Sequence, residues 1–160
     1  MIEKPEFSHL DEKGTARMVD VSQKTPSHRT ATATGTVRLS ETLRQLVAEK
    51  ALPKGDVFTV AKVAGILAAK RCGELIPLCH PLPLTNIQVE LALTETGVEI
   101  TATASCVGPT GVEMEALTAV SVAALTVYDM CKSADKGMVI EAVRLLTKTG
   151  GKSGAWHAEL

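Results

Sequence analysis

Alternating apolar and polar residues predict the strands of this chain. From residue 31 to 39, apolar side chains occupy one face, while three threonines and Arg38 occupy the other, as in a half-buried strand. Two more alternating runs span 87–93 and 98–104, and the segment Thr94–Gly97 between them predicts a hairpin. A last strand is expected over 138–148.

Apolar residues at helical spacing predict helices between these strands. Ser40 is placed to cap a short helix, and Asp56 to cap a second helix with an apolar face over 57–68. A long helix is expected from Val112 to Ser133. Because it is apolar on nearly every side, we expect it to be buried on several sides, which favours a place in a subunit interface.

The order of these elements, β-α-β-β-α-β, is typical of the ferredoxin-like pattern. We therefore expect an α+β fold with an antiparallel sheet and helices packed on one face. Residues 1–29 are predicted to form a mobile N-terminal arm, 30–149 a single domain and 150–160 a flexible glycine-rich tail.

Composition excludes several classes of protein. The 160 residues are 45% hydrophobic but only 2% aromatic, with a net charge of −1. The chain thus lacks the basic surface and stacking rings of a nucleic-acid binder. The N-terminus has no apolar leader, and the longest nearly apolar run, 116–127, is too short to span a bilayer. We expect a cytoplasmic protein with no membrane contact.

The four cysteines form no Cys-x-x-Cys pair. A zinc ribbon is therefore not expected, and buried free thiols are the simplest interpretation.

Two segments could hold a ligand. Leu78, Cys79 and His80 lie in a proline-rich stretch, where His80 could either face a ligand or fill a turn. Glu113, Met114 and Glu115 open the apolar helix. One of these carboxylates could serve only to stabilise the helix N-terminus.

Charged residues supply a third group of candidates. Asp129 and Lys132 are three residues apart, so they are neighbours on one helix face. Either they form a surface ion pair, or they are partly buried and take part in proton transfer. Near-neutral overall charge means that an anion site must be a local cluster of cations. The candidates are Lys54, Lys132, Lys136, Lys148, Lys152 and Arg29.

Taken together, these segments resemble the cyclic pyranopterin monophosphate synthase family of molybdenum cofactor biosynthesis. The matching blocks occur in the family's order and cover 18–22, 54–58, 61–70, 75–82, 110–118, 128–132 and 148–154. The resemblance implies a lyase that converts 3′,8-cyclo-7,8-dihydroguanosine 5′-triphosphate to cyclic pyranopterin monophosphate and releases pyrophosphate. It also implies a ferredoxin-like fold, no metal or redox cofactor, and a homohexamer built as a trimer of dimers.

The resemblance also implies roles for residues. Asp129 would be the catalytic acid–base residue, with Lys54 and Lys132 beside it. Substrate binding would fall to Leu78, Cys79, His80, Glu113, Met114, Glu115, Lys148 and Lys152, and more weakly to Arg29.

Two other classes of function stay open: a non-catalytic nucleotide sensor, and a metal-dependent hydrolase using His80, Glu113 and Asp129. The lack of His/Cys ligand spacing argues against the hydrolase. Glu115 and Asp129 are 14 residues apart on the predicted helix, which is about 21 Å. We therefore expect active sites shared between two subunits.

Overall fold

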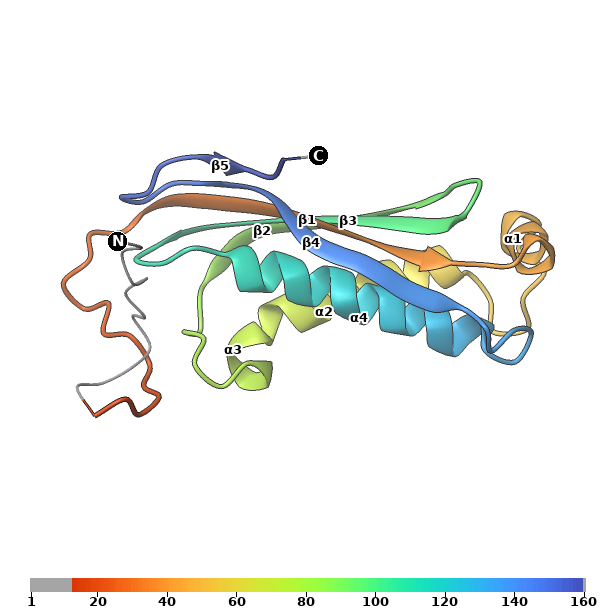
Figure 1. The fold of residues 1–160 in the computed structure, drawn as a ribbon, viewed down its shortest axis with the longest axis horizontal. Coiled ribbons are helices and arrows are strands. Elements are labelled where there is room, and N and C mark those ends of the chain that lie inside the picture. The colour runs from red at the N-terminus through yellow and green to blue at the C-terminus, as the bar shows by residue number, and fades with distance from the viewer. Residues whose placement is uncertain (1–12, 160) are drawn as a thin grey trace, which may run out of the picture.

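A computed structural model of the chain describes residues 13–159. Its centre is one antiparallel sheet in the order β2-β3-β1-β4-β5 (Figure 1). The strands are β1 (Ser27–Arg38), β2 (Leu84–Leu93), β3 (Gly97–Gly108), β4 (Val139–Thr149) and β5 (Trp156–His157). The first four strands have the connectivity of the ferredoxin-like fold, so this prediction is confirmed.

Two long helices pack on the same face of the sheet. The helices are α1 (Glu41–Ala48), α2 (Val57–Lys70), α3 (Cys72–Leu75) and α4 (Glu113–Cys131). Figure 1 shows α2 and α4 running alongside each other under the strands. By length and composition α4 could cross a membrane, but it packs against β1, β3 and α2 as the core helix.

Small side chains bring the layers close together. Ala31, Ala33 and Val37 of β1 are fully buried against α4, which contributes a run of buried alanines and valines. A Cβ at Gly65 of α2 would lie 2.9 Å from the Ala119 carbonyl oxygen. The two helices therefore approach each other at a distance that only glycine permits there.

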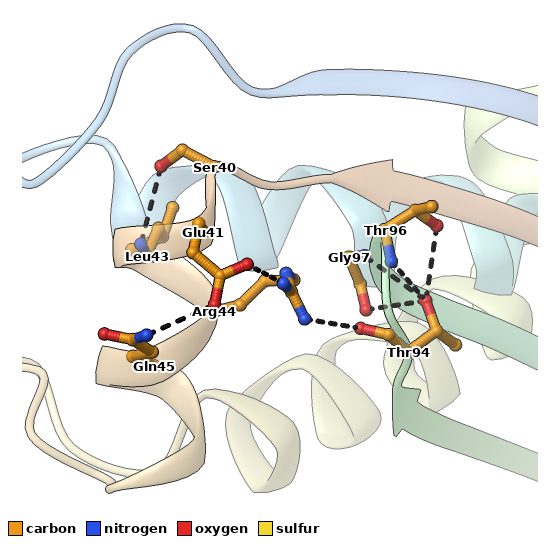
Figure 2. A network of polar contacts seen from close by, with 8 residues as sticks. All are labelled: Ser40, Glu41, Leu43, Arg44, Gln45, Thr94, Thr96 and Gly97. Carbon is orange, nitrogen blue, oxygen red and sulfur yellow. Dashed lines mark hydrogen bonds and ion pairs between the residues drawn. The ribbon is translucent and has the colours of Figure 1, made fainter.

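A polar network fixes α1 against the β2–β3 hairpin (Figure 2). The Ser40 hydroxyl accepts from the Leu43 amide at 3.4 Å and so caps α1, as predicted. Arg44 pairs with Glu41 and donates to the Thr94 carbonyl oxygen. The loop that follows α1 carries Lys54.

The structure extends the sequence prediction at several points. β1 begins at Ser27, inside the predicted arm, and β5 lies inside the predicted tail. The short helix α3 was not predicted. α4 is two residues shorter at its C-terminal end than expected. Residues 1–12 of the predicted mobile arm lie outside the described residues, and the division of the chain at 29 and 149 stays a prediction.

Candidate active site

One cluster of charges lies at the C-terminal end of α4. Lys54 Nζ is 3.0 Å from Asp129 Oδ2, and Lys132 Nζ is 2.7 Å from Asp129 Oδ1. Lys54 also donates to the Asp129 carbonyl oxygen at 2.9 Å. Lys54 is positioned by the start of α2, where the Asp56 carboxylate caps the amides of Phe58 and Thr59. The three predicted catalytic residues thus come together.

Of the two alternatives for the Asp129–Lys132 pair, the single chain has the exposed ion pair and not the partly buried one. The side chains of Asp129, Lys54 and Lys132 are 57%, 45% and 52% exposed. The last turn of α4 packs into the core through Val127 and Cys131, which are fully buried. Asp129 lies between them in the sequence and points away from the core. Helical spacing predicts which residues share a face, but not whether another surface covers it.

Electrostatics fix the charge state of this cluster. Hydrogen bonds from Lys132 and then Lys54 lower the pKa of Asp129 below its ordinary value. The same contact raises the pKa of Lys132. At neutral pH the cluster therefore offers one carboxylate as a proton acceptor and an ammonium group as a donor.

A second cluster surrounds the N-terminal end of α4. Lys148 Nζ lies 3.1 Å from Glu113 Oε1 and donates to Ser153 Oγ at 3.3 Å. The Arg29 guanidinium donates to the carbonyl oxygens of Gly108 and Pro109. A Cβ at Gly151 would overlap the Arg29 guanidinium, so the glycine-rich segment folds directly over it.

These residues line a cavity of about 860 Å³. Its lining holds the cations Lys24, Arg29, Lys148 and Lys152, with Glu113 as the one carboxylate among the described residues. The excess of positive charge suits an anion. Lys24 was missed because the arm shows no periodic pattern, and because the matching family block ends two residues before it.

A smaller cavity of about 220 Å³ adjoins the first. It is lined by Leu78, Cys79, His80, Leu82, Thr110, Gly111, Glu113, Met114 and Glu115. Thr110, Gly111 and Glu113 line both cavities. The two predicted substrate-binding stretches, 78–80 and 113–115, therefore meet in one place, next to the cation cluster.

His80 is held by the arm. Its Nε2 lies 2.7 Å from the carbonyl oxygen of Val19. A carbonyl only accepts, so Nε2 carries a proton and donates. His80 lines the smaller cavity, so this contact places the segment before β1 beside that cavity.

Glu115 differs from Asp129 in its surroundings. Its residue is only 3% exposed, and burial raises the pKa of its carboxyl. The Cys72 thiol close by has a pKa raised by burial to about 12, so it stays protonated. Burial therefore shifts the pKa of Glu115 upward, whereas the two lysines shift the pKa of Asp129 downward.

The two clusters lie apart in a single chain. α4 is continuous from Glu113 to Cys131, so 14 residues of helix separate Glu115 from Asp129 by about 21 Å. Glu113 and Asp129 are separated even further, and one chain cannot place both with His80 around one metal ion. Within residues 13–159, no group of three or more His, Cys, Asp or Glu side chains could hold a metal.

Comparison with known proteins gives a consistent result. The model of the MoaC family matches residues 18–151. The cyclic pyranopterin monophosphate synthase of Novosphingobium aromaticivorans is 58% identical over 153 residues, covering 96% of this chain and 98% of that protein. The synthase of Thermomicrobium roseum is 58% identical over 156 residues, covering 96% of this chain and 94% of its own length.

Proposed function

Since the chain belongs to the MoaC family, we propose that it is a cyclic pyranopterin monophosphate synthase, a lyase of molybdenum cofactor biosynthesis. It converts 3′,8-cyclo-7,8-dihydroguanosine 5′-triphosphate to cyclic pyranopterin monophosphate and pyrophosphate. The observation that carries this proposal is 58% identity to a named synthase over almost the whole of both chains.

The cation-lined cavity would take the triphosphate. Arg29, Lys148 and Lys152 supply positive charge where the leaving pyrophosphate gains negative charge. Lys24 adds a fourth cation from the arm. Glu113 neutralises Lys148 at 3.1 Å in the free protein, and a phosphate oxygen would replace that carboxylate as the partner of Lys148.

The adjoining smaller cavity would take the ring system. Leu78, Met114 and the aliphatic lining give apolar contact, while His80 and Glu115 give polar contact. Burial raises the pKa of Glu115 and so favours its protonated form, which would donate a hydrogen bond to a ring oxygen or nitrogen. Because the two cavities share residues, one nucleotide could span both.

Asp129, Lys54 and Lys132 would carry the proton transfers. The rearrangement breaks and makes C–N bonds and closes a cyclic phosphate, and each step needs a proton donor or acceptor. Asp129 would be the acceptor, since its carboxylate lies in contact with both lysines. Lys132 is the donor nearest to it, at 2.7 Å.

A second copy of the chain would complete the site. The outer surface of the α2–α4 layer exposes Val60, Val63, Leu67 and Leu125 at 45%, 50%, 51% and 58%. Val60, Val63 and Leu67 share one face of α2 by their helical spacing, and exposed apolar side chains of this kind are typical of a protein interface. We place Asp129 of one subunit beside Glu115 of another, in a hexamer built as a trimer of dimers.

We place the enzyme in the cytoplasm. The four cysteines are free, three of them are buried, and a reducing compartment keeps such thiols unpaired.

The test is turnover. The purified chain is incubated with the cyclised triphosphate, and pyrophosphate and the cyclic phosphate product are measured together. We expect both in equal amounts, with Asp129→Asn inactive and Asp135→Asn active as the matched control. Tight binding of the triphosphate without pyrophosphate release would contradict the proposal and indicate a nucleotide sensor instead.

A further inference from the structure

The last strand places the chain's one tryptophan opposite Lys148, one of the cations that line the large cavity. β5 pairs with β4 so that Trp156 lies opposite Lys148 and His157 opposite Thr147. The pairing continues at Ala158, whose amide donates to the Leu146 carbonyl oxygen at 2.8 Å. Directly opposed residues of an antiparallel pair share one face, with Cβ atoms about 5 Å apart. Trp156 therefore lies on the same face as the Lys148 side chain, and His157 lies on the other face.

That face is the cavity side. Lys148 reaches Glu113 at the start of α4 and Ser153 in the glycine-rich loop, both of which line the large cavity. The loop from Gly150 to Ala155 is anchored at both ends, by β4 before it and by β5 after it. Trp156 therefore stands directly after this loop, on the strand face to which the Lys148 side chain also belongs.

The Lys148 side chain is unusually covered for a lysine of this site. It is 29% exposed, whereas the side chains of Lys54 and Lys132 are 45% and 52% exposed. An aromatic ring beside a lysine covers its methylene stem and attracts its ammonium group. A ring in that place would restrict the rotamers of Lys148 further than Glu113 and Ser153 do, so less side-chain entropy would be lost when an anion binds.

We propose that Trp156 is a positioning residue that acts through Lys148, holding its ammonium group toward the cavity that takes the triphosphate. The inference rests on the proposed function, because that function supplies the anion. The effect falls on binding of the substrate and of pyrophosphate. It does not fall on the proton transfers, since Asp129 lies at the other end of α4.

Three variants of the full chain test this. Trp156→Ala removes the ring, Trp156→Phe keeps an aromatic ring, and His157→Ala removes the neighbouring side chain from the opposite face of the same strand. Calorimetry gives the affinity of each variant for pyrophosphate. Steady-state kinetics with the cyclised triphosphate give KM and kcat.

We expect Trp156→Ala to weaken pyrophosphate binding and raise KM by about two- to fivefold, the size of one exposed cation–π contact, with kcat unchanged. Trp156→Phe should restore most of the loss, and His157→Ala should bind as the wild type does. Equal binding by Trp156→Ala and the wild type would overturn the inference. So would an equal loss in His157→Ala, which would show that the strand matters and the ring does not.

The wild type separates this inference from the proposed function. Because the chain has a single tryptophan, its tryptophan fluorescence reports on Trp156 alone. Pyrophosphate should therefore change the emission of the wild type but not that of Lys148→Met. If the wild type binds pyrophosphate but turns over no substrate, the proposed function fails, and the binding comparison still decides the role of Trp156. If it does not bind pyrophosphate, the inference fails.

Discussion

Replacing Gly150 with alanine tests how the glycine-rich loop is attached to β1. Gly150 has a φ of 97°, and a Cβ there would lie 2.2 Å from the His28 carbonyl oxygen and 3.0 Å from Arg29 Cδ. Gly154 in the same loop has a φ of 64°, but its Cβ would meet no atom of the described residues within 4 Å. The two glycines differ in their close approach to β1.

The expected magnitudes follow from this difference. Gly154→Ala should cost about 1 kcal/mol of the free energy of unfolding, the strain of an alanine in the left-handed region. Gly150→Ala adds an overlap with backbone, and relieving it requires the loop to move by about 1 Å. We therefore expect a cost of about 2–3 kcal/mol and a higher KM, because the loop would separate from Arg29.

Urea denaturation gives the free energies, and steady-state kinetics give KM. Gly154→Ala is the matched control, and its KM should equal that of the wild type. If Gly150→Ala were no more destabilising than Gly154→Ala and left KM unchanged, the loop would not contact β1 as described.

Three further predictions concern the charged groups. Asp129→Asn should fold and assemble normally but lose at least about 100-fold in kcat; wild-type rates would reject its role as the base. Lys148→Ala or Lys152→Ala should raise KM and weaken inhibition by pyrophosphate, and unchanged values in both variants would make these lysines ordinary surface charges. Burial raises the pKa of Glu115, so the folded state holds that proton more tightly, and stability falls as pH rises from the unfolded pKa to the folded pKa. Glu115→Gln should therefore gain stability over the wild type as pH increases across that window, by about 1.4 kcal/mol for each pH unit between the two pKa values. A difference in the free energy of unfolding that does not vary with pH would show that the pKa of the Glu115 carboxyl is not shifted.

Much of the fold follows from periodicity. The alternating runs predicted β1, β2 and β3, because each strand buries one defined face, and the continuous apolar pattern predicted α4, because that helix is buried on several sides. β5 could not be predicted in this way. Two residues, Trp156 and His157, are too few to show an alternation, and their pairing depends on how the loop after β4 turns back.

The candidate site was predicted through its family blocks rather than from residue patterns alone. Those blocks contain Asp129, Lys54 and His80, and the structure brings the residues of each cluster together. Lys24 lies in a stretch without periodicity, so only folding of the arm against the tail reveals it. The exposure of Asp129 depends on what packs over the outer surface of α4, which no pattern within one chain determines.

The central claim is that each active site takes residues from two subunits, because α4 keeps Glu115 and Asp129 about 21 Å apart. The most direct measurement is complementation between a Glu115→Ala chain and an Asp129→Asn chain, each inactive alone, mixed under conditions in which labelled subunits are shown to exchange. Shared sites predict that activity returns, since some interfaces then combine an intact Glu115 with an intact Asp129. Demonstrated exchange with no recovery of activity would contradict the account and place the whole site within one chain.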